Sequence, residues 1–260
     1  MPRSKILFYD IETRPMVAEV WGLRDQNVGL SQVREFGGTI CFSAKWLGKA
    51  PVMFFSDWTT GHKEMLEAMH SLWSEADAIC GYNNDRFDNK KMKGEFIRHG
   101  MEPPPPVSSI DLYKTVRSQF SFDSHKLDHV SQLLGIGCKV KHQGHELWSQ
   151  VLQGDEKAQR TMERYCRQDS KLTERLYKKL LPYIANHPHL GGGNSDACPA
   201  CGSLNVHKNG NRYTRCFVVQ RLHCQDCGHW YKGKATRRAV RDIATDTGGG
   251  DKRHTEQEVA

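Results

Sequence analysis

Short apolar runs mark the beginning of the chain and are separated by polar segments. Residues 5–10 form an apolar and aromatic run, and two more runs follow at residues 39–46 and 51–56. Runs of this length and composition predict buried strands. The four residues 47–50 separate the second run from the third and predict a hairpin. We therefore expect the first three strands to form an antiparallel meander.

A helical period replaces these runs further along the chain. Residues 61–74 predict a helix because apolar side chains recur at helical spacing, namely Met65, Leu66, Met69, Leu72 and Trp73. Residues 77–82 return to strand character, 88–99 predict a helix, and 110–112 form a short strand candidate. Further helices are expected at residues 126–134, 145–152 and 155–184, the last one capped by Asp155. This order predicts an α/β domain with a mixed central sheet flanked by helices.

Glycine-rich and polar segments divide the chain into parts. A first domain is expected over residues 1–185. Residues 186–197 contain three consecutive glycines and predict a flexible linker. A small cysteine-containing module follows over residues 198–235, and the polar residues 236–260 predict a disordered tail.

The composition is typical of a soluble globular protein. Hydrophobic residues make up 38% of the 260 positions, which is enough for a packed core and unlike a disordered chain. No run approaches the roughly eighteen apolar residues that a membrane-spanning helix needs, so no membrane partner is expected. The apolar stretch before Asp10 is too short for a secretory signal, and we expect a cytoplasmic protein.

The positive charge of the chain is concentrated near its C-terminus. The formal net charge is +7, and residues 198–242 contain nine Lys or Arg residues against two acidic ones. A basic module beside a nearly neutral domain favours a polyanionic partner such as nucleic acid. A solubilising surface is the alternative explanation of this charge.

Several acidic residues are candidate metal ligands. Asp10 and Glu12 are two residues apart at the end of the first predicted strand, so both side chains lie on one face and would repel each other without a cation. Asp88 begins a predicted helix, and Tyr165 and Asp169 share one face of a later helix. Taken singly, each of these features has another explanation. Asp10 and Glu12 are compatible with a solvated strand edge, and Asp88 with a helix cap. Tyr165 and Asp169 are compatible with an ordinary amphipathic helix.

Together these elements resemble the DEDD exonucleases, in the subclass that has a tyrosine in its third motif. The three motifs correspond to Asp10-x-Glu12, Asn84-x-x-Phe87-Asp88 and Tyr165-x-x-x-Asp169. Residues 109–113 and 126–135 also resemble the exonuclease domain of family B DNA polymerases and its stand-alone relatives. The resemblance implies an RNase H-like fold and a stand-alone 3′–5′ exonuclease, since no polymerase domain follows the third motif.

The resemblance also implies a mechanism with two Mg²⁺ or Mn²⁺ ions. Asp10 would bridge both ions, Glu12 and Asp169 would complete the site that holds the attacking water, and Asp88 would support the second ion. Tyr165 would orient the water or the scissile phosphate.

Two assignments around the second motif are less direct. Asn84 would contact the substrate or support the metal ligands. Asp85 competes with Asp88 for the metal, but only Asp88 follows an aromatic residue and lies four positions after an asparagine. Four basic residues follow this motif and could contact phosphates, although a solvated helix face explains them at least as well; they are Lys90, Lys91, Lys93 and Arg98.

The implied substrate is nucleic acid, with single-stranded DNA favoured and RNA still open. A separate polymerase or replication protein is a further expected partner. The alternatives are a structure-selective endonuclease with the same site and a non-catalytic nucleic-acid-binding adaptor. A small exonuclease of polymerase type without a polymerase suits a phage or mobile element, which would place it in the host cytoplasm.

The C-terminal cysteines predict a metal site of another kind. Cys198-x-x-Cys201 and Cys224-x-x-Cys227 each offer two thiolates from a tight turn, and two such turns complete a tetrahedral structural Zn²⁺ site. Cys216 lies outside both pairs and is expected to be a bystander.

The cysteine module resembles the zinc ribbons of some insertion-sequence transposases. The resemblance rests on Cys198-Pro-x-Cys201-Gly202, Lys208-Asn209-Gly210 and Cys224-x-x-Cys227-Gly228. It supports nucleic-acid binding, for which Arg212, Arg215 and Arg221 would supply charge and neighbouring aromatic residues would supply stacking surfaces. A purely structural or protein-docking ribbon is the alternative.

Overall fold

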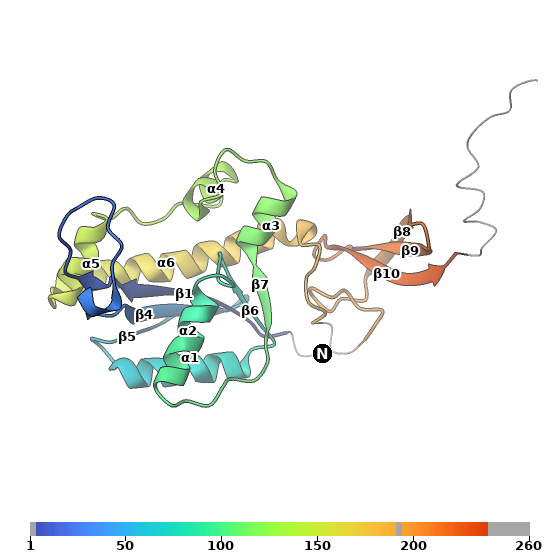
Figure 1. Cartoon of the computed structure of the whole chain (residues 1–260). Helices are drawn as coiled ribbons and strands as arrows, with labels where there is room; N and C mark the ends of the chain where they lie inside the picture. The colour runs from blue at the N-terminus through green and yellow to red at the C-terminus, as the bar shows by residue number, and fades with distance from the viewer. Residues whose placement is uncertain (1–3, 191–193, 239–260) are drawn as a thin grey trace, which may run out of the picture.

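The computed structural model describes residues 4–190 and 194–238. Its centre is a five-stranded mixed sheet in the order β5-β4-β1-β6-β7 (Figure 1). The strands are β1 (Ile6–Arg14), β4 (Gly38–Trp46), β5 (Met53–Ser56), β6 (Ala78–Gly81) and β7 (Ser108–Asp111). β1, β4 and β5 pair in antiparallel fashion, whereas β6 is parallel to β1 and to β7. The predicted α/β fold with a mixed sheet and an initial meander is therefore confirmed.

Helices cover both faces of this sheet because β1 alternates two sets of apolar side chains. Leu7, Tyr9 and Ile11 pack on α1 (His62–Glu75) and α2 (Asp88–Arg98). Ile6 and Phe8 face the opposite side, where the long helix α6 (Glu156–Leu180) lies. α3 (Leu112–Gln119), α4 (Leu127–Leu133) and α5 (His145–Leu152) connect β7 to α6. No helix in the described part of the chain is long and apolar enough to cross a membrane.

The structure departs from the predicted elements at several ends. β1 continues past Glu12 to Arg14, with a register shift between Glu12 and Thr13, so the acidic pair is not at the strand end. Leu112 belongs to α3 because the Asp111 side chain caps that helix by accepting from the Tyr113 amide. The predicted helix 155–184 ends at Leu180 and continues as the 3-10 helix η2 (Leu181–Tyr183), which contains Pro182. A small antiparallel pair, β2 (Val17–Ala18) with β3 (Val33–Glu35), was not predicted, and η1 (Leu30–Gln32) lies in the segment that joins the two strands.

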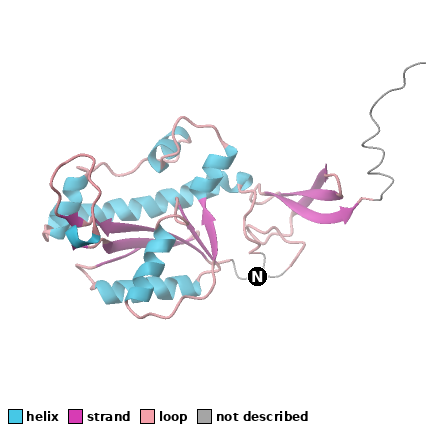
Figure 2. Cartoon of the chain, viewed as in Figure 1, coloured by secondary structure: helices cyan, strands magenta, loops and turns pink. Residues whose placement is uncertain are grey.

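The C-terminal module is a three-stranded antiparallel sheet in the order β10-β9-β8 (Figure 2). Its strands are β8 (Val206–Tyr213), β9 (Phe217–Cys224) and β10 (Trp230–Arg237). β10 continues two residues beyond the predicted boundary at 235. Apart from residues 236–238, the predicted disordered tail lies outside the described residues.

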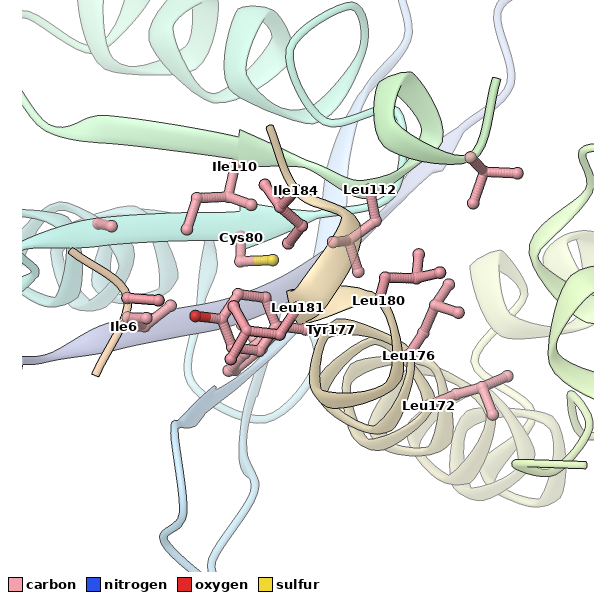
Figure 3. Packing of buried hydrophobic residues seen from close by; sticks show 14 of the residues in the cluster. Ile6, Cys80, Ile110, Leu112, Leu172, Leu176, Tyr177, Leu180, Leu181 and Ile184 are labelled. Carbon is pink, nitrogen blue, oxygen red and sulfur yellow. The ribbon is translucent and has the colours of Figure 1, made fainter. Parts of the chain in front are cut away.

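The base of this module shares a hydrophobic core with the first domain. Cys198, Ala200 and Cys224 belong to the same buried cluster as Tyr177 and Leu181 at the end of α6. Figure 3 shows the helix side of this cluster, where Tyr177, Leu180, Leu181 and Ile184 gather beside Cys80 and Ile110.

Polar contacts secure the same junction. The His229 ring bonds to the Leu181 carbonyl at 2.9 Å through Nδ1, and the Leu190 amide donates to the Pro199 carbonyl at 2.7 Å. Tyr177 Oη lies 2.8 Å from His187 Nε2. The described residues of the predicted linker 186–197 thus contact both sides of the junction, and the domain boundaries themselves stay predictions.

Candidate active site

Three of the four predicted metal-binding carboxylates meet between β1 and α6. One oxygen from each of Asp10, Glu12 and Asp169 lies within 4.8 Å of the other two. The strand period turns Asp10 and Glu12 toward α6. Ser43 on β4 fixes the helix by bonding to the Cys166 carbonyl at 2.7 Å and to Ser170 Oγ at 2.6 Å. Residues more than 150 positions apart in the chain therefore form one acidic cluster, named here the carboxylate cluster.

Asp88 lies beside this cluster rather than within it. It is the first residue of α2, is 6% exposed, and its Oδ1 accepts from the Ile11 amide at 3.3 Å. That amide belongs to the residue between Asp10 and Glu12 on β1. Asp88 thus reaches the edge of the site through the backbone of the strand that carries the acidic pair.

Asp85, the competing acid of the second motif, is engaged elsewhere. Its carboxylate accepts hydrogen bonds from Ser109 at 2.5 Å and from Lys114 at 2.6 Å. Partial burial alone would raise the pKa of Asp85, but the hydrogen bonds from Lys114 and Ser109, together with the charge of Lys114, hold the pKa below its usual value. The geometry therefore favours Asp88 over Asp85 as the acid nearest the cluster.

Burial and mutual repulsion disfavour the ionised carboxylates. Burial, with the charge of Asp169, raises the pKa of Glu12 to about 8, and the same causes raise the pKa of Asp10 well above its usual value. Burial raises the pKa of Asp88 to about 6 despite hydrogen bonds from the backbone. The pKa of Asp169 is raised by burial although Lys139 lowers it. A bound cation would stabilise all four charges.

Lys139 is a site residue that the sequence analysis did not identify. Its ammonium lies 2.5 Å from Asp169 Oδ2 and donates to Tyr165 Oη at 3.1 Å. Burial opposes the charge, but Asp169 and Asp10 raise the pKa of Lys139 overall. No motif distinguishes Lys139 from the exposed Lys141 two positions later, so only the tertiary structure reveals it.

Tyr165 lies one helical turn before Asp169 and is 7% exposed. Burial and the charge of Asp169 raise the pKa of Tyr165 above its usual value, so the hydroxyl stays protonated near neutral pH. The rings of His142 and Trp148 lie edge-on to the Tyr165 ring and restrict its position. Tyr165 is thus a positioned hydroxyl beside the carboxylate cluster.

One observation tests whether the cluster suits a metal ion. Among the described residues, Asp169 Oδ1 is a buried oxygen with no hydrogen-bond partner, while its second oxygen binds Lys139. A buried carboxylate oxygen left without a donor costs free energy unless a cation or water binds it. Together with two further carboxylates within reach, this oxygen fits a site for a hard divalent ion.

Asn84 has a different position from the one expected of a substrate contact. Its side chain is fully buried and donates to Ser109 Oγ at 3.1 Å. It lies in the turn between β6 and α2, where Asn83 has a positive φ of 65°. In this structure Asn84 holds the turn that presents Asp88, and it exposes no atom to a substrate.

The four cysteines of the C-terminal module form a second candidate metal centre. One sulfur from each of Cys198, Cys201, Cys224 and Cys227 lies within 4.8 Å of the others, and all four thiols are free. Gly202 and Gly228, each directly after a pair, share a φ of 73°, a left-handed conformation that glycine adopts without strain. Cys216 lies apart and is exposed, as expected of a bystander.

Basic and aromatic side chains occupy two surfaces. On the cysteine module, Arg212 on β8, Arg215 in the turn before β9 and Arg221 on β9 are exposed, and Arg221 donates to the Asn209 carbonyl at 3.1 Å. Tyr213, on the same strand as Arg212, is 68% exposed. The second surface is a pocket of ≈ 540 Å³ that follows β1 beyond Glu12 and is lined by Arg14, Met16, Phe36, Gly37, Lys91 and Arg98. Both surfaces combine cations with ring or thioether groups.

Comparison with known proteins agrees with this architecture. A protein-family model described as RNase_H superfamily matches residues 7–181, which is more than half of the chain. The matched region contains the central sheet except Ile6, the first residue of β1, and the helices from α1 to α6, including every carboxylate described above. The cysteine module lies outside the match. No curated protein matches the chain significantly.

Proposed function

This chain belongs to the RNase H superfamily and has a nuclease-type domain, and from this premise we propose that it is a metal-dependent 3′–5′ exonuclease acting on DNA. The observation that carries the proposal is the convergence of Asp10, Glu12 and Asp169 with the Tyr165 hydroxyl one helical turn away. Such a set combines ligands for hard cations with a group that can orient water.

The carboxylates would hold two Mg²⁺ or Mn²⁺ ions. When bound, a pair of such ions activates water and stabilises both oxygens of an in-line phosphoryl displacement. Asp10, Glu12 and Asp169 would be the direct ligands, and Asp88 would support them from the α2 side of β1. The unpartnered Oδ1 of Asp169 and the raised pKa values of the carboxylates support this assignment.

Two neutral or cationic groups would position the reacting atoms. Tyr165 keeps its proton and would donate a hydrogen bond to the attacking water or to a phosphate oxygen. Lys139 holds the Tyr165 hydroxyl at 3.1 Å and would add positive charge where the phosphate becomes more negative. Neither group needs to change its protonation state for this role.

The surroundings of the site favour a substrate that enters by a free end of the nucleic-acid strand. Asp169, Asp88 and Tyr165 are all less than 8% exposed, so the reacting phosphate would have to enter a recess. The pocket lined by Arg14, Lys91 and Arg98 continues from β1 and suits the phosphates of the adjoining strand. Single-stranded DNA fits such a recess better than the middle of a rigid duplex.

The cysteine module would bind one structural Zn²⁺ and provide a second nucleic-acid-binding surface. Four thiols within 4.8 Å match the ligand set of a structural zinc site. The exposed arginines and Tyr213 would contact backbone and bases of the strand. Under the alternative, the same surface docks a protein partner such as a polymerase or replication protein.

A cleavage time course tests the proposal. A single-stranded DNA oligonucleotide labelled at its 5′ end is incubated with Mg²⁺ or Mn²⁺ and with wild-type protein, Asp10→Ala, Asp88→Asn or Asp85→Asn. We expect a ladder that shortens from the 3′ end for wild type and Asp85→Asn, and strongly reduced cleavage for the other two variants and in EDTA. Asp85→Asn is the matched control because it removes a nearby charge that Lys114 already neutralises.

Other results would replace the proposal. Internal cuts without 3′ shortening would identify an endonuclease with the same site. Intact DNA and intact RNA in every lane, with binding retained in a gel shift, would identify a nucleic-acid-binding adaptor.

A further inference from the structure

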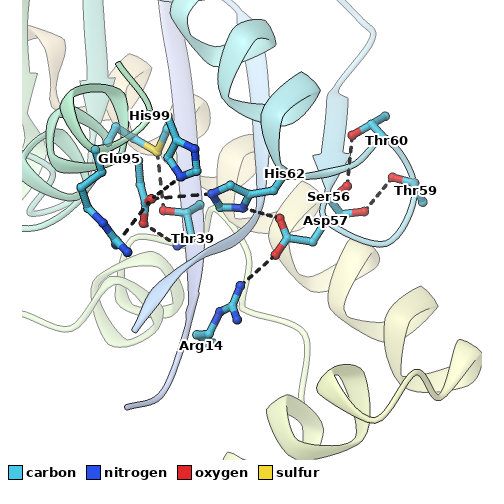
Figure 4. Close-up of polar contacts among 11 residues, drawn as sticks. Arg14, Thr39, Ser56, Asp57, Thr59, Thr60, His62, Glu95 and His99 are labelled. Carbon is cyan, nitrogen blue, oxygen red and sulfur yellow. Dashed lines mark hydrogen bonds and ion pairs between the residues drawn. The ribbon is translucent and has the colours of Figure 1, made fainter. Parts of the chain in front are cut away.

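A second group of metal-binding side chains lies at the opposite end of α2 from Asp88. His62 is the first residue of α1, Glu95 lies in the last turn of α2, and His99 follows that helix directly. One ligand atom from each of these residues lies within 4.8 Å of the other two. Figure 4 shows the His62 and His99 imidazoles beside each other and directed at the Glu95 carboxylate, with their ring centroids 4.9 Å apart. We name these three residues the histidine cluster.

The distances within the histidine cluster suit a shared cation better than direct hydrogen bonds. His62 Nε2 and His99 Nε2 lie 3.6 Å and 3.7 Å from Glu95 Oε2, which is longer than a normal hydrogen bond. Two ligands that each lie about 2.1 Å from one tetrahedral ion are separated by about 3.4 Å. Only a small closure of the three side chains would therefore be needed to coordinate an ion.

Neighbouring groups orient these ligand atoms in the way that metal sites require. Asp57 Oδ1 lies 2.8 Å from His62 Nδ1, which leaves Nε2 of the same ring directed at Glu95. A carboxylate on the far nitrogen of a histidine is the usual outer partner of a metal-bound imidazole. Glu95 is fixed as well, because its Oε1 accepts from the Thr39 amide at 3.2 Å and its Oε2 faces the histidines.

Access and charge are also compatible with an ion. The His99 side chain is 39% exposed and Glu95 is 5% exposed, so the cluster opens to solvent on the His99 side. Arg98 lies 3.8 Å from Glu95 Oε2, but its side chain is 59% exposed and forms only a solvent-screened pair. Arg14 contacts Asp57 Oδ2 at 3.4 Å and not Glu95. Displacing Arg98 would leave a carboxylate and two imidazoles for the incoming cation.

We propose that His62, Glu95 and His99 form a further metal site that binds a transition-metal ion of the Zn²⁺ type. Two imidazoles and one carboxylate select such ions over Mg²⁺, which prefers oxygen ligands. The site shares no residue with the carboxylate cluster or with the four cysteines. The ion ties the start of α1 to the end of α2, and α2 begins with Asp88.

Zinc stoichiometry of the full chain tests this site. Metal-free protein is titrated with Zn²⁺ against a chromophoric chelator in excess Mg²⁺, which occupies the carboxylate cluster. We expect two tightly held Zn²⁺ ions for wild type and one for His99→Ala. The matched control is His70→Ala, because His70 also lies on α1 but its Nε2 donates to the Glu102 carbonyl at 2.8 Å instead. This control retains two ions.

Variants of the supporting residues make the test more specific. Glu95→Gln keeps an oxygen for the Thr39 amide but removes the anionic ligand, and it lowers the stoichiometry to one. Asp57→Asn retains the ion with about 10- to 100-fold weaker affinity, since only the outer partner of His62 changes.

A Co²⁺ titration separates this site from the cysteines. Thiolate-to-cobalt charge transfer in the near ultraviolet reports the cysteine site, and its amplitude is equal in wild type and His99→Ala. One Zn²⁺ in wild type, or equal stoichiometry in wild type, His99→Ala and Glu95→Gln, overturns the proposal. Circular dichroism in EDTA verifies that each variant is folded, and His99 is a low-risk position because it is exposed and outside the helix.

Discussion

The two predicted metal centres of this chain are built in opposite ways. The four cysteines lie within residues 198–227 and are brought together by two local turns, each closed by a backbone hydrogen bond from Gly202 or Gly228. The carboxylate cluster combines β1 with α6 and exists only because the whole sheet and its helices pack correctly. The first centre depends on local sequence, and the second depends on the fold.

The two centres also differ in how much they destabilise the fold when no metal ion is bound. A hydrogen bond from the Cys227 thiol lowers the pKa of Cys198 to about 5, so the cysteine site already stabilises one thiolate without an ion, whereas the carboxylates are raised in pKa by burial and by one another. A raised pKa means that ionising the carboxylate above its ordinary pKa destabilises the fold until a cation binds. We therefore expect the cysteines to contribute mainly to stability and the carboxylates mainly to function.

The largest effect is expected from Asp10→Asn. Cleavage should fall by about 100- to 1000-fold or more, the loss typical of removing one electrostatic stabiliser of a transition state. The melting temperature in EDTA at pH 8 should stay equal or rise, because a repelling charge is removed. Both quantities are measured on the same preparation, with Asp85→Asn as the control that keeps activity. A marked drop in melting temperature would contradict the proposed division of roles.

Cys201→Ser should lower stability and leave cleavage largely unchanged, which is the reverse of the effect expected for Asp10→Asn. The variant loses a zinc ligand, and structural zinc sites contribute about 10 kcal/mol or more to the folding of small zinc modules. We expect zinc content to fall by one ion and the melting temperature to drop by several degrees, with cleavage of a short oligonucleotide largely retained. Cys216→Ser, at an exposed cysteine outside the cluster, is the matched control. Unchanged melting in both variants would show that the cysteines bind no structural ion.

A smaller effect is expected from Lys139→Met. The substitution removes the cation next to Asp169 and Tyr165, so cleavage should fall by about tenfold to a hundredfold. The pH profile should also move to higher pH, because the pKa of Asp169 is no longer lowered by Lys139. Lys141→Met, two residues away at an exposed position, should leave rate and profile unchanged. Equal losses in the two variants would point to general charge effects on nucleic-acid binding.

The smallest predicted effect is the dependence of Mg²⁺ affinity on pH. Glu12 has a pKa of about 8 and Asp88 of about 6, so ions that bind these carboxylates between pH 6 and 8 must displace protons. Mg²⁺ affinity, measured by calorimetry, should therefore rise with pH by up to about tenfold per unit for each proton released. Over the same window the stability of the metal-free protein should fall, since carboxylates with raised pKa values lose stability as they ionise. An affinity that is flat from pH 6 to 8 would argue against ligation by Glu12.

Some residues of both centres could be predicted from the sequence because their spacing alone determines their geometry. Alternation along β1 places Asp10 and Glu12 on one face, and paired Cys-x-x-Cys turns bring four sulfurs together. Lys139 could not be found in this way, since a loop of ordinary composition carries it to Asp169. For Asn84, motif position left a substrate contact and support of the metal ligands both open, and the structure buries its side chain in the turn that presents Asp88.

Tertiary contacts explain the remaining differences. The glycines at 191–193 favour a tether, but contacts of Leu181 with His229 and of Leu190 with Pro199 join residues that no local pattern relates. The histidine cluster was also not predicted, because His62 and Glu95 lie on different helices and converge only through packing of α1 and α2.

The core shared by the end of α6 and the cysteine module limits how the protein can be shortened for laboratory use. A truncation at residue 185 would uncover Tyr177, Leu181 and Ile184, which are 1%, 8% and 3% exposed in the intact chain. Newly exposed apolar surface of this kind promotes aggregation. A soluble minimal nuclease would therefore require polar replacements on that face, and the intact chain is the better starting point for crystallisation and inhibitor screening.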